Sequence, residues 1–360
     1  MKITARPNFS GGGMPPGAGE KWRTLATICL SILFLGVVAA DSAPLAPLAE
    51  VRSVDLPGFA GDFDHFGVDL RGGRLFLAGE DHKTLEVFDL QTLHRLGSIS
   101  SFGAPHSVLY LARPDELYVT DGGDGTVKIF GGADYGPKAK IQLLEGADSA
   151  GYDAATGIYY VVTGGKDVPL DYSVVSAVNL STRKKIGDLR FDSNHVEAMA
   201  LEKNGPRIFI NVTDKAAVAV LDRRSMKVLA WWPVGVAEQN SPIALDEANH
   251  RLFTICREPP TFVVMDTTSG KVVTSLPTAG RADDVAFDQK NHRIYVPGGE
   301  GYIAVYQQRD ADHYNLVAKV PSAPGAKTAL LVPEMNQLFV AASPGDSKAM
   351  AKVLTFAVHP

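Results

Sequence analysis

The chain has 360 residues, of which 45% are hydrophobic and 21% charged, and its formal net charge at pH 7 is −5. This composition is that of a globular protein, and the acidic balance without a long Lys/Arg run argues against a nucleic-acid-binding surface. The two cysteines are Cys29 and Cys256. Cys29 lies in the predicted leader described next, so we expect no internal disulfide in the mature chain.

The first forty residues have the pattern of a secretory signal peptide. Lys21 and Arg23 precede an apolar run at residues 25–38, and small residues follow. We therefore predict a signal peptide at residues 1–40, with Met14 as an alternative start, and a periplasmic or secreted protein. The run is shorter than the roughly 20 residues of a membrane span, so we expect no transmembrane segment in the mature chain. If it is not cleaved, the same run is expected to anchor the protein to a membrane.

Residues 41–49 are rich in Pro and Ala and are predicted to be a linker. From residue 50 onward the chain consists of short alternating segments, such as residues 84–89 and 261–266, between clusters of Gly, Asn, Asp and Pro. This alternation predicts half-buried antiparallel strands, and no long stretch keeps a helical period. The fold class is therefore predicted to be all-β.

One polar position recurs ahead of each predicted inner strand, at spacings of 42, 42, 49, 44, 42 and 44 residues. A strand-rich period near 40 indicates a β-propeller with one blade per repeat, so we predict a seven-bladed β-propeller at residues 50–360. Five of the seven positions are acidic or histidine. We call this set the mouth row: Asp64, His106, Asp148, Glu197, Ser241, Asp283 and Lys327.

The last blade is predicted to take its fourth strand from the N-terminal part of the propeller sequence. Only three strands follow Lys327, at residues 329–332, 337–341 and 352–358. The segment 50–56 precedes the first blade and has no blade of its own. We expect it to be the outer strand of the last blade, so that the N-terminal strand closes the ring and covers open sheet edges.

A signature motif carries a family resemblance. Residues 118–122 read Tyr-Val-Thr-Asp-Gly, and residues 209–213 are a looser copy. Residues 50–360 thus resemble the YVTN-repeat, YncE-like exported bacterial propellers, although Asp121 stands where the signature has Asn. The resemblance implies a seven-bladed propeller. Because such propellers include binding proteins and lactone hydrolases, it implies no single function.

The mouth row is predicted to lie at one end of the central channel, where propellers usually bind ligands. Carboxylates held close together take up protons or bind a cation, and histidine beside carboxylate suits a transition metal or acid–base chemistry. A divalent metal at the channel mouth is therefore one expected cofactor, although no sequence-local metal motif identifies it. The candidate ligand-binding residues are Asp64, His65, His106, Asp148, His195, Glu197, Asp283, Asp284 and Lys327.

Loops between second and third strands are expected to reach the same face. They carry further polar residues, namely Glu80, Asp81, His82, Asp121, Asp124, Lys166, Asp167, Asp214, Lys215, Arg257, Glu258, Glu300 and Asp346.

The sequence is consistent with four functions. The preferred hypothesis is a monomeric binding or interaction module for a small molecule, metal ion or protein segment. The mouth row is also consistent with a water-filled channel that binds nothing, or with a protein–protein scaffold. A fourth alternative is a lactonase-type hydrolase. In that case Glu197 or Asp283 would position water, His106 or His195 would move the proton, and Arg257 or Lys327 would stabilise the oxyanion.

Overall fold

The computed structural model describes residues 45–345 and 349–360. The predicted signal peptide at residues 1–40 and Asp346 lie outside these residues. Within the described part of the chain, no helix is long and apolar enough to cross a membrane.

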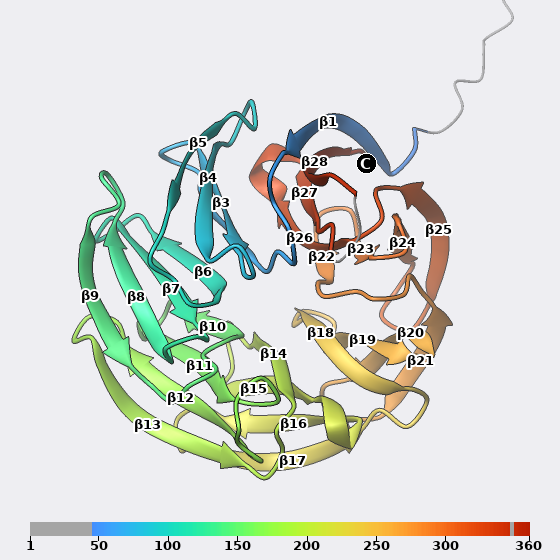
Figure 1. Cartoon of the computed structure of the whole chain (residues 1–360). Helices are drawn as coiled ribbons and strands as arrows, with labels where there is room; N and C mark the ends of the chain where they lie inside the picture. The colour runs from blue at the N-terminus through green and yellow to red at the C-terminus, as the bar shows by residue number, and fades with distance from the viewer. Residues whose placement is uncertain (1–44, 346–348) are drawn as a thin grey trace, which may run out of the picture. The chain divides into compact units, whose positions relative to one another are not determined.

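Residues 45–345 and 349–360 form a ring of four-stranded antiparallel sheets, the seven blades of a β-propeller (Figure 1). This arrangement confirms the predicted fold class and blade number. Blade 1 contains β2 (Phe66–Asp69), β3 (Arg74–Gly79), β4 (Thr84–Asp89) and β5 (Arg95–Ile99). Blade 2 contains β6 (Pro105–Leu111), β7 (Glu116–Asp121), β8 (Thr126–Gly131) and β9 (Pro137–Gln142). Blade 3 contains β10 (Ala150–Asp153), β11 (Ile158–Gly164), β12 (Ser173–Asn179) and β13 (Lys184–Phe191).

Blades 4 to 6 follow in the same order. Blade 4 contains β14 (Val196–Leu201), β15 (Arg207–Val212), β16 (Ala217–Asp222) and β17 (Lys227–Pro233). Blade 5 contains β18 (Glu238–Asp246), β19 (Arg251–Glu258), β20 (Pro260–Asp266) and β21 (Val272–Pro277). Blade 6 contains β22 (Ala286–Asp288), β23 (Arg293–Gly298), β24 (Tyr302–Gln308) and β25 (Tyr314–Pro321). Blade 7 contains β26 (Ala326–Val332), β27 (Gln337–Ala342) and β28 (Ala351–Val358). Single 3-10 turns occur at Thr213–Lys215 and Pro333–Met335.

The N-terminal strand closes the ring, as predicted. β1 (Leu48–Leu56) pairs antiparallel with β28, with Leu48 opposite Val358 and Leu56 opposite Ala351. The strand begins two residues before the expected start at residue 50. Leu48 and Leu56 are both buried and pack into two different hydrophobic clusters. The first strand therefore covers the edge of the last blade and also contributes to its core.

The hydrophobic core lies between the blades. In blade 1, Phe76 and Leu85 are fully buried and pack in one cluster with Leu117 and Val119 of blade 2. Middle strands are buried on both faces because each blade is covered by a neighbour on each side, whereas the outer β17 alternates between exposed and half-buried residues. Burying each such Phe or Leu contributes roughly 1.5–3 kcal/mol to stability. This packing holds the inner strands round the channel.

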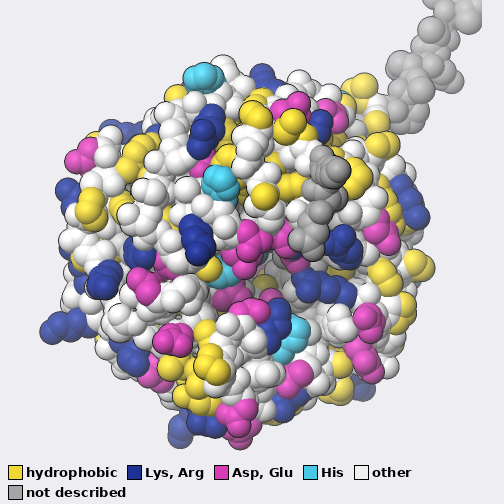
Figure 2. All heavy atoms as spheres, viewed as in Figure 1, with side chains coloured by type: hydrophobic (Ala, Val, Ile, Leu, Met, Phe, Trp, Pro, Cys, Tyr) yellow, Lys and Arg dark blue, Asp and Glu magenta, His cyan; other side chains and the backbone are white. Residues whose placement is uncertain are grey.

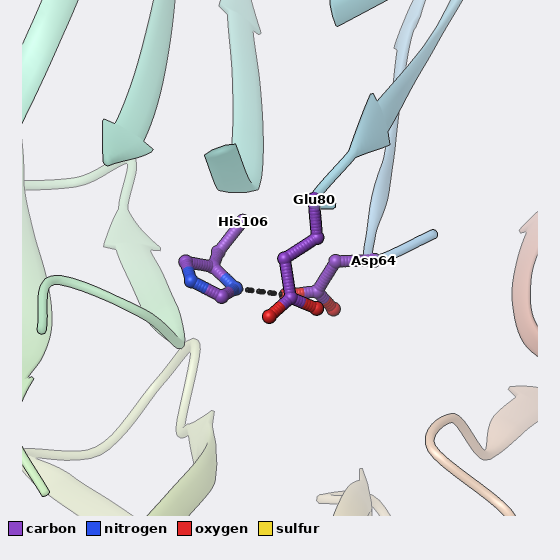
Figure 3. Close-up of side chains that lie close together, drawn as sticks. All are labelled: Asp64, Glu80 and His106. Carbon is purple, nitrogen blue, oxygen red and sulfur yellow. Dashed lines mark hydrogen bonds and ion pairs between the residues drawn. The ribbon is translucent and has the colours of Figure 1, made fainter. Parts of the chain in front are cut away.

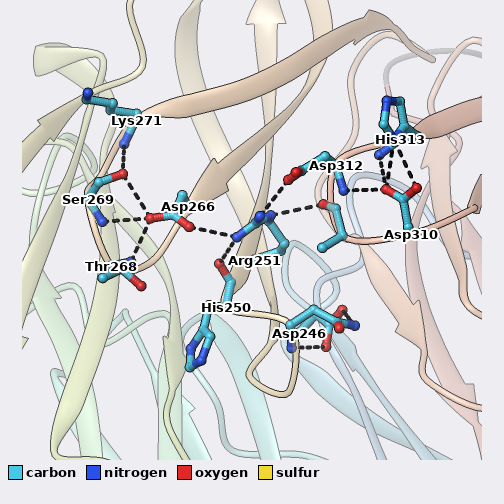
Figure 4. Close-up of polar contacts among 12 residues, drawn as sticks. Asp246, His250, Arg251, Asp266, Thr268, Ser269, Lys271, Asp310, Asp312 and His313 are labelled. Atoms are coloured by element: carbon cyan, nitrogen blue, oxygen red, sulfur yellow. Dashed lines mark hydrogen bonds and ion pairs between the residues drawn. The ribbon is translucent and has the colours of Figure 1, made fainter.

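Arginines at the starts of second strands tie neighbouring blades together. Arg251 at the start of β19 donates to the Asp266 carboxylate of its own blade at 2.7 Å. It also donates to the backbone oxygen of Ala311, at 2.9 Å, and to Asp312 in the next blade (Figure 4). The equivalent bonds to a backbone oxygen of the next blade are Arg74 to Gly132, Arg207 to Thr267 and Arg293 to His359.

Candidate functional site

All seven residues of the mouth row line one cavity of about 240 Å³ on the channel axis. In Figure 2, acidic, basic and histidine side chains surround the hollow at the centre of this face. The other residues that line this mouth cavity are Asp62, Phe63, His65, Glu80, Ser149, Lys166, Asp167, Ala198 and Arg257. The period read from the sequence therefore corresponds to a ring of side chains in space.

The signature motif helps to hold the mouth row in place. The buried Thr120 hydroxyl accepts from the Ser107 backbone N–H at 2.8 Å and donates to the Asp148 backbone oxygen of the next blade at 2.9 Å. Asn211, at the matching position of blade 4, donates to the Ser241 backbone oxygen at 2.7 Å. The third signature position thus binds the inner strand of the following blade at its mouth-row residue.

One side of the mouth carries acidic groups around a histidine. Nδ1 of His106 lies 2.5 Å from Oδ2 of Asp64 and 3.6 Å from Oδ1 of Asp148. Glu80 lies in the turn between β3 and β4. Its side chain points toward those of His106 and Asp64 (Figure 3). Asp64, Glu80 and His106 each offer one ligand atom, and these atoms all lie within 4.8 Å of one another.

His65 lies between two carboxylates. Its Nε2 is 3.4 Å from Oδ1 of Asp64, and its Nδ1 is 3.4 Å from Oδ1 of Asp284. His65 lines both the mouth cavity and a second cavity of about 280 Å³ farther along the inner strands. Asp284 lines this inner cavity and not the mouth cavity, together with less polar residues such as Leu109 and Tyr152. His65 therefore stands where the mouth passes into the channel.

The basic residues that blades 5 and 7 contribute to the mouth, Arg257 and Lys327, are already paired. Nζ of Lys327 lies 2.6 Å from Oδ2 of Asp283 and 3.0 Å from Oδ2 of Asp62, and Arg257 donates to the other oxygen of Asp283. Burial alone would lower the pKa of Lys327, but Asp283 and Asp62 raise it above its ordinary value. This side of the mouth is a network of compensated charges.

His195 and Glu197 form a third group. Nε2 of His195 lies 2.8 Å from Oε1 of Glu197, and Nζ of Lys166 is 3.4 Å from the same oxygen. His195 does not line the mouth cavity. It lines a neighbouring cavity of about 160 Å³, which shares His106 and Glu197 with the mouth. Burial would raise the pKa of Glu197, but His195 and Lys166 lower it.

The pKa values of Glu80, Asp148 and His106 are raised on the crowded acidic side of the mouth. Burial, followed by the neighbouring carboxylates, raises the pKa of Glu80 to about 7 even though His106 lowers it. Burial likewise raises the pKa of Asp148 to about 6. Burial would lower the pKa of His106, but Asp148, Asp64 and Glu80 raise it to about 10. Near neutral pH this side of the mouth therefore holds protons that compensate its carboxylates.

Asp64 behaves differently from its neighbours. Burial acts to raise its pKa, but the charges of His65 and His106 outweigh burial and lower it well below its ordinary range. The pKa of His65 is raised well above its ordinary value by Asp64 and Asp284, against the effect of burial. Asp64 is thus a carboxylate held between two positively charged imidazoles.

The structure brings most of the candidate residues together in the mouth cavity, while His195 and Asp284 line the two adjoining cavities. Several further residues that line the mouth cavity were not among the candidate ligand-binding residues. Glu80 and Lys166 were expected on this face, but nothing in the sequence singled them out. Asp62 was not predicted. It precedes the mouth-row residue Asp64 by two positions, just as the candidate His195 precedes the mouth-row residue Glu197, and this equal spacing was the signal that could have identified it.

Comparison with known proteins gives the fold alone. No family model and no curated protein matches the chain. A solved chain from the "Crystal Structure of Mitotic Checkpoint Complex" is similar with a TM-score of 0.72 and 14% identity, covering 94% of this chain and 99% of that one. A chain of Kuenenia stuttgartiensis hydrazine synthase is similar with a TM-score of 0.70 and 14% identity, covering 82% and 96%.

Proposed function

We propose that this protein is a binding module that holds a small, positively charged ligand at the channel mouth. The observation that carries this proposal is the uneven pairing of charges around one cavity. Arg257 and Lys327 are bound to Asp283, and Lys166 lies near Glu197, so the basic residues of the mouth already have acidic partners. In contrast, no Lys or Arg of the described residues forms an ion pair with Asp64, Glu80 or Asp148; imidazoles are the cationic groups within ion-pair distance, and Lys327 acts on Asp64 from farther away.

A bound cation would replace the protons of the acidic side. Carboxylates at close range in a partly buried site repel one another when ionised, and either protons or a cation relieve this repulsion. The raised pKa values of Glu80 and Asp148 are the signs of such repulsion. A ligand with a positive group would therefore bind at this side, with its remaining part in the mouth cavity.

The proposal includes export from the cytoplasm and kinship with the YVTN-repeat propellers. Lys21, Arg23 and the apolar residues 25–38 support export, and residues 118–122 support the kinship. Expression of the full chain with its own leader, followed by cell fractionation and mass determination of the mature protein, tests the location. Recovery of the uncleaved chain in the cytoplasm contradicts it.

Calorimetry tests the binding proposal. Full chain treated with a chelator is titrated with a panel of organic amines and divalent cations. We expect at least one of them to bind, and Asp148→Asn to weaken that binding about tenfold through the loss of one close charge. Asp171→Asn removes a carboxylate from an exposed loop position outside the mouth cavity and is the matched control. The proposal fails if nothing in the panel binds or if both variants bind like the wild type.

A second candidate function is hydrolysis, favoured by the hydrogen-bonded His195–Glu197 pair beside a cavity. A histidine held by a carboxylate is suited to remove a proton from water. Arg257 and Lys327 are poor oxyanion ligands in this arrangement, because Asp283 holds both. A panel of lactones and esters assayed with wild type and His195→Gln tests this candidate. Absence of turnover, or turnover unchanged in the variant, argues against it.

A further inference from the structure

We propose that Asp64, Glu80 and His106 form a binding site for a divalent transition-metal ion. This inference rests on the proposed function, because it names the cation that the mouth binds. The three side chains come from two adjacent blades and point toward one another (Figure 3). Three features support a metal site here: the spacing of the ligand atoms, the orientation of the His106 imidazole and the lack of a hydrogen bond or ion pair to the Glu80 carboxylate among the described residues.

The spacing needs only a small adjustment to hold an ion. With metal–ligand bonds of about 2.1 Å, the ligand atoms of a tetrahedral site lie about 3.4 Å apart. The ligand atoms of the three residues already lie within 4.8 Å of one another. The contact of 2.5 Å between His106 Nδ1 and Asp64 Oδ2 would lengthen by about 1 Å as the ion replaces the shared proton.

The imidazole presents one nitrogen to the site. Nδ1 of His106 faces Asp64, whereas Nε2 faces Gly122 on the other side of the ring. A Cβ atom at residue 122 would lie 2.8 Å from Nε2, so glycine is what lets the ring occupy this position. His65, 3.4 Å from the second oxygen of Asp64, would orient that carboxylate from outside the metal shell.

The Glu80 carboxylate lacks a partner within residues 45–345 and 349–360, and this supports a bound cation independently of the spacing. Its side chain is half-buried and faces His106 and Asp64, yet its carboxylate has no hydrogen bond or ion pair with any residue in the described part of the chain. A partly buried carboxylate without a partner is unfavourable unless it is protonated or bound to a cation. A metal ion bound between Asp64 and His106 would also be within reach of Glu80.

The donor set indicates the class of metal. Two carboxylates balance the charge of a divalent ion, and a neutral imidazole adds a nitrogen ligand. Calcium takes six to eight oxygen ligands, whereas mixed nitrogen and oxygen sets suit zinc, cobalt and manganese. Three protein ligands leave at least one coordination position open toward the mouth cavity, where water or a small ligand can bind.

The test uses the full chain after chelator treatment, titrated with Zn²⁺, Co²⁺ and Ca²⁺ by calorimetry, with Co²⁺ also followed by its visible absorption. We expect one Zn²⁺ per chain, a Co²⁺ spectrum with nitrogen and oxygen ligation, and Ca²⁺ binding at least about 100-fold weaker. Glu80→Gln and His106→Gln should each reduce Zn²⁺ affinity at least about tenfold. Asp171→Asn, an acidic change at an exposed position outside the mouth cavity, should alter it less than about threefold.

The outcomes separate this inference from the proposed function. Glu80→Gln removes a carboxylate without a partner among the described residues, so it remains informative if His106→Gln does not fold. Zn²⁺ binding that is absent, or unchanged in Glu80→Gln, overturns the metal site. If an organic amine binds while Zn²⁺ does not, the metal site alone fails. If neither binds, the proposed function fails with it.

Discussion

Nδ1 of His106 lies 2.5 Å from Oδ2 of Asp64, although the two residues are 42 positions apart and belong to adjacent blades. Asp64 precedes β2 and His106 lies near the start of β6, the inner strands of blades 1 and 2, so the contact depends on how the two blades pack. Because the contact joins two blades at the channel mouth, it links the stability of the ring to the chemistry of the site.

Asp64→Asn is expected to destabilise the protein by about 2–4 kcal/mol at pH 7, because it leaves His65 and His106 without their shared carboxylate. The pKa of Asp64 is lowered in the folded protein, so its contribution is present above the ordinary value of 3.8 and is lost as the pH falls below it. Urea unfolding at pH 7 and at pH 3 measures the difference. Asp55→Asn, at an exposed pair with Lys352, should cost less than about 1 kcal/mol. Equal effects of the two changes at pH 7 would contradict the prediction.

Glu80→Gln is expected to stabilise the metal-free protein at pH 8 by about 1–3 kcal/mol. The pKa of Glu80 rises from 4.5 to about 7 on folding, so between these values the folded protein holds a proton that the unfolded chain releases. Wild-type stability therefore falls as the pH rises through this window, and the variant lacks this loss. Urea unfolding in chelator at pH 4 and pH 8 measures it, with equal stabilities expected at pH 4. A variant less stable than wild type at pH 8 would show that Glu80 is held by a favourable interaction.

Thr120→Val is expected to cost about 1–3 kcal/mol, because it leaves the Ser107 N–H and the Asp148 backbone oxygen without the buried hydroxyl between them. The change is nearly isosteric, so packing is little altered. Thermal unfolding measures the cost. Thr120→Ser keeps the hydroxyl and is the control, which should retain most of the stability. If Thr120→Val is as stable as the wild type, or if Thr120→Ser is the more destabilised of the two variants, the hydrogen bonds of the hydroxyl contribute little to stability.

Gly122→Ala is expected to displace the His106 ring, since the added Cβ would lie 2.8 Å from its Nε2. We expect Zn²⁺ affinity to fall at least about tenfold although no ligand has been removed. Calorimetry with the chelator-treated protein provides the measurement. Gly97→Ala, where a Cβ meets nothing within 4 Å, is the control and should bind like the wild type. Unchanged affinity in Gly122→Ala would show that the ring position is not critical.

Removal of β1 is expected to open the ring. A chain that begins at Pro57 loses the pairing of Leu48–Leu56 with β28 and the buried side chains of Leu48 and Leu56. The exposed edge of β28 then favours association between chains. We expect the melting temperature to fall by about 10 °C or more and soluble aggregates to form, as measured by thermal unfolding and size-exclusion chromatography. Addition of a peptide spanning residues 45–57 should reverse part of the effect. A monomeric truncated chain with an unchanged melting temperature would contradict this account of closure.

The architecture could be predicted from the amino-acid sequence. Alternation within strands, polar turns and a period near 40 are properties of neighbouring residues, so they predict blades without knowledge of distant contacts. The missing fourth strand after Lys327 and the unassigned segment before Asp64 also predicted the closure of the ring by β1. The mouth row followed because strand direction places the start of every inner strand on one face.

The pairing of the mouth residues could not be predicted from the sequence and is seen only in the folded protein. In the sequence, Asp64 and Asp283 are equivalent members of one row, yet Asp283 is bound by Arg257 and Lys327 while Asp64 lies between His65 and His106. These pairings depend on the reach of the loops and on long side chains from other blades, which no periodic pattern records. For the same reason Glu80 emerged as a neighbour of Asp64 only in three dimensions. Local periodicity therefore predicts where polar groups gather, whereas the charge each of them carries is decided by contacts between blades.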